Sequence, residues 1–148
     1  MKYVFSAPKK YHQRQKELAD FLKERDLAKF VEQVLGLSGL SKLKIGHSAI
    51  GKKAEFREPD EIWLDFRNEM KYMALCIAHE YVHLLIRKKK IKMPYETEQA
   101  IAVLTQLQYE DWAGIRKFTK KIARELLIAN GAWPAGKILL APRPIVKK

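Results

Sequence analysis

The sequence predicts an α+β fold, because segments with helical features lie on both sides of one segment that alternates like β-strands. Apolar residues recur at helical spacing over residues 9–36 and 114–129, and a long apolar run lies within residues 68–89. Residues 42–65 instead alternate apolar and polar side chains between glycines. These patterns predict N-terminal helices, a short antiparallel sheet of two to four strands, and then three further helical segments.

The N-terminal segment, residues 9–36, is expected to form one or two helices that end near Gly36. Its apolar positions are Leu18, Phe21, Leu22, Leu27, Phe30, Val31 and Val34. The sheet is expected to use the stretches around Leu43–Ile45, Ala54–Phe56 and Ile62–Phe66, separated by Gly46, Gly51 and the turn Pro59-Asp60.

The second half of the chain is expected to be helical up to Asn130-Gly131. Residues 68–89 form one helix, and a tight connection leads to Pro94, which suits the first turn of a helix that runs to about residue 112. Residues 114–129 form another. Residues 132–148 are expected to be an extended tail of a single domain that covers residues 1–148.

Composition indicates a soluble, intracellular protein. Of the 148 residues, 47% are apolar, which excludes a disordered chain. No apolar run approaches the roughly 20 residues that a bilayer crossing needs, and the N-terminal apolar stretch is too short for a secretory signal. The single cysteine, Cys76, fits a reducing compartment such as the cytoplasm. A small apolar role for Cys76 is favoured over a role at a metal.

The net charge of +12 makes a polyanionic partner such as nucleic acid conceivable. Basic residues cluster at Arg87–Lys90, at residues 116–124 and at Lys147-Lys148. A solvated, lysine-rich surface is the simpler interpretation. A nucleic-acid partner is therefore an expectation of second rank, and neither the oligomeric state nor a particular partner follows from the sequence.

The motif His79-Glu80-Tyr81-Val82-His83 is the strongest functional signal. Residues four apart lie on one face of a helix, so the two imidazoles can share one metal ion, usually zinc. Glu80 stands at the edge of that face, where its carboxylate can take a proton from a zinc-activated water. The apolar flanks on both sides of the motif predict a buried helix, and buried histidines need polar partners.

A third zinc ligand is expected downstream, because a catalytic zinc usually has three protein ligands and one open position. The remaining histidines, His12 and His47, both precede the motif. Glu96 and Glu98 open the following helix, which a short connection folds back towards the histidines. Side-chain direction favours Glu98, with Glu96 as the alternative.

The chain resembles the small gluzincins, zinc peptidases in which a later glutamate completes the H-E-x-x-H site. The residues that carry the resemblance are Ile62–Asp65, Cys76–Leu85 and Glu96–Ala100. The most similar types are the minigluzincins and the ImmA/IrrE-like peptidases. The resemblance implies a zincin-like fold, with His79, His83 and Glu98 as zinc ligands, Glu80 as general base and acid, and an edge strand that binds extended peptide. Tyr95 and Tyr109 are candidates to stabilise the oxyanion.

Three functions are compatible with these observations. The first is a zinc metallopeptidase that cleaves peptides or unfolded proteins. The second is a basic zincin that acts at nucleic acid or cleaves a regulator; the SprT-like version would need a third histidine that is missing downstream. The third is a silent or latent zinc-binding protein, for example one whose proline-rich tail, residues 141–146, lies in the substrate groove.

Overall fold

A computed structural model describes residues 1–140 and confirms the α+β class. The strands are β1 (Lys2–Phe5), β2 (Lys42–His47), β3 (Ala54–Arg57) and β4 (Glu61–Leu64). The helices are a 3-10 turn η1 (Lys9–Tyr11), α1 (His12–Glu24), α2 (Leu27–Leu35), α3 (Met70–Lys88), α4 (Tyr95–Trp112), α5 (Lys120–Ala129) and α6 (Trp133–Leu140).

The sheet is mixed, so the predicted antiparallel sheet is wrong for two of its pairings. The strand order is β1-β2-β4-β3, and β2 pairs parallel with both β1 and β4. Helices α1 and α2 connect β1 to β2, and such a long crossover allows parallel pairing. The chain then passes to β3 at the outer edge and returns through β4, the only antiparallel neighbour of β3 in the described sheet. The sequence analysis missed β1.

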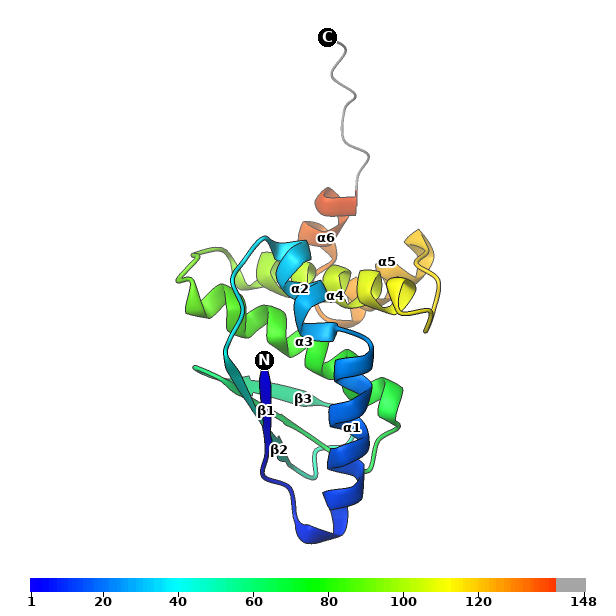
Figure 1. Cartoon of the computed structure of the whole chain (residues 1–148). Coiled ribbons are helices and arrows are strands. Elements are labelled where there is room, and N and C mark those ends of the chain that lie inside the picture. Colours follow the sequence, from blue (N-terminus) through cyan, green and yellow to red (C-terminus); the bar gives the residue numbers. More distant parts are fainter. Residues whose placement is uncertain (141–148) are drawn as a thin grey trace.

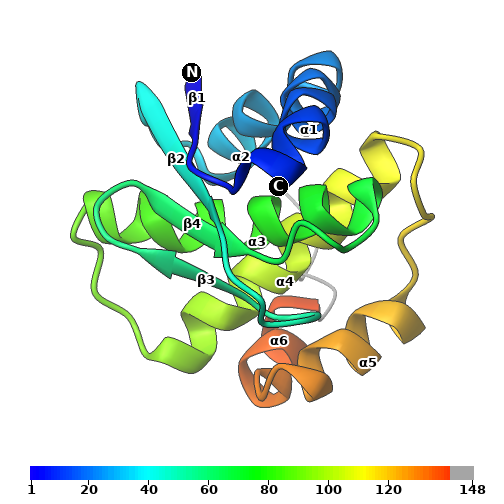
Figure 2. The same ribbon diagram turned by 90° about the horizontal axis from the view of Figure 1, so that it is seen from below.

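Helix α3 lies between the sheet and α4 (Figure 1). Seen from below, α1 and α2 lie on one side of this pair of helices, and α5 and α6 lie on the other (Figure 2). The core between the sheet and α3 contains Leu43, Ile45, Ile62 and Leu64 from β2 and β4. A second apolar cluster joins α4 to α5 and α6.

The N-terminal helical segment divides at Asp26, whose φ of 44° is left-handed and cannot continue a helix. Gly36 ends α2 with a φ of 66°, as the sequence predicted. Near the other end of the chain, Thr119 caps α5 by accepting a hydrogen bond from the Ile122 amide at 3.2 Å. The cap places the start of α5 at Lys120, later than the predicted start at residue 114.

The prediction of an extended tail over residues 132–148 is wrong for its first half, because residues 133–140 form the helix α6. Gly136 of α6 packs so closely against the side chain of Leu127 that a larger residue would force Leu127 to shift. The possible inhibitory segment, residues 141–146, lies outside the described residues. No helix within residues 1–140 has both the length and the apolar character that a membrane crossing requires.

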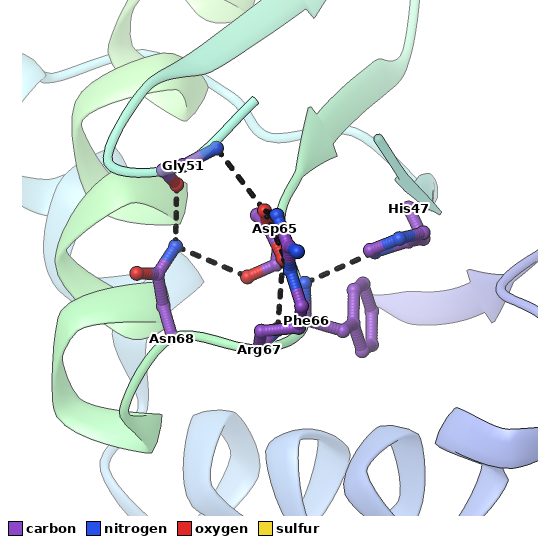
Figure 3. Close-up of polar contacts among 6 residues, drawn as sticks. All are labelled: His47, Gly51, Asp65, Phe66, Arg67 and Asn68. Atoms are coloured by element: carbon purple, nitrogen blue, oxygen red, sulfur yellow. Dashed lines mark hydrogen bonds and ion pairs between the residues drawn. The ribbon is translucent and has the colours of Figure 1, made fainter. Parts of the chain in front are cut away.

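The buried carboxylate of Asp65 joins the loop before β3 to the turn that precedes α3 (Figure 3). Its oxygens accept hydrogen bonds from the Gly51 amide at 3.1 Å and from the amide and guanidinium of Arg67 at 2.5–3.1 Å. Asn68 donates to the Gly51 carbonyl, and the Tyr72 hydroxyl donates to the Lys52 carbonyl. The loop that leads into β3 is therefore held at Gly51 by Asp65 and Asn68, and at Lys52 by Tyr72.

The Asp65→Asn variant is expected to lower the free energy of unfolding at pH 7 by about 1–3 kcal/mol, because charge-assisted hydrogen bonds are lost from a buried site. The Arg67 guanidinium holds the pKa of Asp65 below its ordinary value of about 3.9. A lowered pKa stabilises the fold above the unfolded-state pKa, and this stabilisation is lost as the pH falls. Urea denaturation should therefore show the largest deficit near neutral pH and a shrinking one below about pH 4.

The control is Asp111→Asn, at an exposed position near the end of α4, which should change stability by less than about 0.5 kcal/mol. An equal loss in both variants, or a deficit for Asp65→Asn that does not vary with pH, would contradict this account of the loop.

Candidate metal centre

A pocket of about 470 Å³ opens where α3 faces α4 and the edge strand β3. The motif residues His79, Glu80 and His83 line it from α3, and Gln99 and Gln106 line it from α4. Another part of its wall comes from β3 and the loop before it, through Lys52, Lys53, Ala54, Glu55 and Phe56. The three motif residues expected to form a site therefore line one pocket.

The ring of His83 is fixed by stacking and by a buried carboxylate. Phe56 stacks on it with ring centroids 4.8 Å apart and planes 12° apart, and Tyr95 stacks with centroids 5.9 Å apart. Nδ1 of His83 lies 2.5 Å from Oε2 of Glu98, whose carboxylate also accepts from Nε of Arg87. Because a carboxylate only accepts, Nδ1 of His83 donates this hydrogen bond, and Nε2 is the ring nitrogen that faces Gln99.

His79 is held by the two glutamines of α4. Its Nδ1 lies 3.2 Å from Oε1 of Gln106, and its Nε2 lies 3.1 Å from Oε1 of Gln99. Burial, together with the charge of neighbouring His83, lowers the pKa of His79 to about 4. His79 is therefore neutral at pH 7, which is the form that binds metals.

The two imidazoles converge on one point. Nε2 of His83 lies 2.8 Å from Oε1 of Gln99, the same oxygen that Nε2 of His79 approaches. If Nδ1 of His83 donates to Glu98 and Nδ1 of His79 donates to Gln106, both Nε2 atoms present lone pairs next to the Gln99 carbonyl oxygen, which also has lone pairs. Three acceptors facing one another favour a shared cation, so the donor chemistry fits a metal ion such as zinc.

Glu80 is the buried carboxyl group of the pocket. Burial raises the pKa of Glu80 to about 8, with a smaller contribution from the charge of Glu55 on β3. A carboxyl group whose pKa lies near neutrality can both accept and return a proton, which is the requirement for a general acid and base. A divalent cation in the pocket would favour its charged form.

The predicted site residues take different positions around this point. His79, Glu80 and His83 come together as predicted, and Glu98 lies at Nδ1 of His83, behind the ring. Within residues 1–140, Glu96 forms no hydrogen bond or ion pair with either histidine, and no three His, Cys, Asp or Glu side chains are grouped so as to hold a metal. Glu98 as a zinc ligand stays a prediction.

The other candidates divide between the pocket and the core. Tyr95 lines the pocket, whereas Tyr109 is buried against Phe30 and Trp112 and does not line it. Cys76 also lines the pocket, and burial raises the pKa of its thiol to about 11, so the thiol is protonated at pH 7. His47 accepts a hydrogen bond from the Phe66 amide at 3.1 Å (Figure 3) and does not line the pocket.

Sequence reasoning missed Gln99 and Gln106, because it searched α4 for carboxylates and imidazoles. Their spacing is the signal that could have found them. Residues seven apart lie on the same face of a helix, and Gln99 directly follows the favoured Glu98. Both amides contact His79 in the structure.

Comparison with protein-family models, with curated proteins and with solved structures finds no match for this chain. The functional interpretation therefore rests on the residues and geometry of the pocket.

The Glu98→Gln variant is expected to lower the free energy of unfolding at pH 7 by about 1–3 kcal/mol, because the buried charge beside Arg87 and His83 is lost. Chemical denaturation of chelator-treated protein measures this cost without a contribution from metal. Glu96→Gln, two residues earlier in the same helical turn, is the control and should change stability by less than about 0.5 kcal/mol. Equal stability of the two variants would show that Glu98 does not support the His83 ring.

Proposed function

We propose that the protein is a zinc-dependent metallopeptidase that hydrolyses peptide bonds, with His79 and His83 as zinc ligands and Glu80 as general base and acid. The observation that carries this proposal is the convergence of both Nε2 atoms on one point inside a pocket that Glu80 also lines. The H-E-x-x-H spacing supports it, because the motif lies on α3 as its chemistry requires.

The chain contributes position and proton transfer to this reaction. Zinc, when bound, would polarise the scissile carbonyl and lower the pKa of a water to about 7. Glu98 and the stacked rings keep His83 in one orientation, and Gln106 does the same for His79. A carboxyl oxygen of Glu80 takes a proton from water and returns it to the leaving amine.

The edge strand β3 supports an extended peptide as substrate. Among the described strands, β3 pairs with β4 alone, so its other side is available to a further strand. It also lines the pocket through Ala54, Glu55 and Phe56. A peptide that adds to this edge would be carried past the motif residues, with main-chain hydrogen bonds providing the affinity.

A second function, zinc binding without turnover, is favoured by one observation. Within residues 1–140 no third His, Cys, Asp or Glu completes a metal site, and an amide oxygen faces the two histidines instead. The same experiment separates the two functions, because a silent protein would bind zinc and cleave nothing.

Replacement of Glu80 by Gln is expected to reduce peptidase activity by about 10²–10⁴-fold while zinc stays bound, because the amide cannot accept the proton. The assay follows cleavage of dye-labelled, denatured casein by the zinc-loaded protein, with bound zinc measured in the same samples. Treatment with a chelator should abolish cleavage, and added zinc should restore it.

The matched control is Glu58→Gln, an exposed glutamate in the turn between β3 and β4, which should retain full activity. Unchanged cleavage by Glu80→Gln would overturn the role given to Glu80. Zinc binding by wild type without cleavage of any unfolded protein would favour the silent protein.

A further inference from the structure

We propose that the side-chain oxygen of Gln99, and not the carboxylate of Glu98 or Glu96, is the third protein ligand of the zinc. The inference rests on the proposed zinc site and changes its ligand set to two imidazoles and one neutral amide. Glu98 then acts as the partner that orients His83 from behind the metal.

The first argument is position. Oε1 of Gln99 lies 3.1 Å from Nε2 of His79 and 2.8 Å from Nε2 of His83. Tetrahedral ligands about 2.0–2.2 Å from a metal lie roughly 3.3–3.6 Å from one another. A small widening of these two contacts would therefore let an ion bind between the Gln99 oxygen and the two nitrogens.

The second argument is orientation, which a chain of hydrogen bonds sets. The Asn130 amide nitrogen donates to the Leu126 carbonyl at 2.7 Å, and this contact directs Oδ1 of Asn130 towards α4. Oδ1 in turn accepts from Nε2 of Gln99 at 3.4 Å. With its nitrogen used there, Gln99 presents oxygen, the atom able to ligate, to the histidines.

The third argument is that Glu98 is already engaged on both oxygens. Oε2 lies 2.5 Å from Nδ1 of His83, and Nε of Arg87 donates to Oε1 at 3.2 Å and to Oε2 at 3.3 Å. To ligate, the buried Glu98 would have to give up its contacts with the half-buried Arg87 and the buried His83, which is costly. A carboxylate on the far nitrogen of a metal-binding histidine is the common supporting arrangement.

A neutral ligand set has a measurable consequence. Two imidazoles and one amide leave the full double positive charge on the ion, so a carboxylate at position 99 should bind it more strongly. The chain should therefore hold zinc more weakly than its own Gln99→Glu variant does. This gain in affinity is a result that a purely structural role of Gln99 would not produce.

The test is zinc affinity, measured by competition with a chromophoric chelator on full-length, metal-stripped protein. Relative to wild type, Gln99→Glu should bind zinc at least about tenfold more tightly. Gln99→Ala should bind it at least about 10–100-fold more weakly, since loss of even a supporting partner of a ligand costs that much. Co²⁺ replaces zinc for absorption spectroscopy, and its visible bands should change in both Gln99 variants. Glu96→Gln is the control and should match wild type, and circular dichroism of each metal-free variant checks the fold.

Glu98→Gln tests the supporting role given to Glu98. This variant should weaken zinc binding yet keep the Co²⁺ band pattern of wild type. Unchanged affinity in Gln99→Glu and Gln99→Ala, with altered bands only in Glu98→Gln, would overturn the inference and leave the peptidase proposal intact. Failure of wild type to bind zinc would overturn the inference and the zinc site together. Tight binding by Gln99→Glu without cleavage of casein by wild type would support the ligand and remove the peptidase.

Discussion

The burial of two imidazoles and a carboxyl group in the helix between the sheet and α4 is the constraint on which the site depends. Helix α3 is apolar on nearly every face, and its motif residues are buried with its core residues. Buried polar groups must find partners. The first four turns of α4 provide them for both histidines through Glu98, Gln99 and Gln106, so the antiparallel packing of the two helices also assembles the site.

The fold was predictable where the pattern is local. Gly36 predicted the end of α2, and Pro94 predicted the start of α4. Both predictions hold because helix capping and the proline ring act within a few residues. The strand pairing was not predictable, since whether β2 lies beside β3 or β4 depends on contacts far apart in sequence. Strand β1 is only four residues long, and its pairing with β2 exists only after α1 and α2 fold between them.

The site was predictable as far as the helix period reaches. His79 and His83 share a face by spacing alone, and the apolar flanks correctly predicted their burial. The partners on α4 depend on how that helix is rotated about its axis, because successive residues point in directions 100° apart. Only side-chain direction was available to estimate this rotation from the sequence. That rotation places Glu98 at Nδ1 of His83 and its neighbour Gln99 at Nε2.

X-ray absorption at the zinc edge tests the central claim most directly, because it measures the donor atoms of zinc in the loaded protein. Two imidazoles with oxygen ligands predict donors at about 2.0–2.2 Å, outer-shell scattering from two histidine rings, and no sulfur at about 2.3 Å. That result with one zinc per chain would support His79 and His83 as a shared site. A sulfur contribution from Cys76, scattering from one ring, or no bound zinc would contradict it.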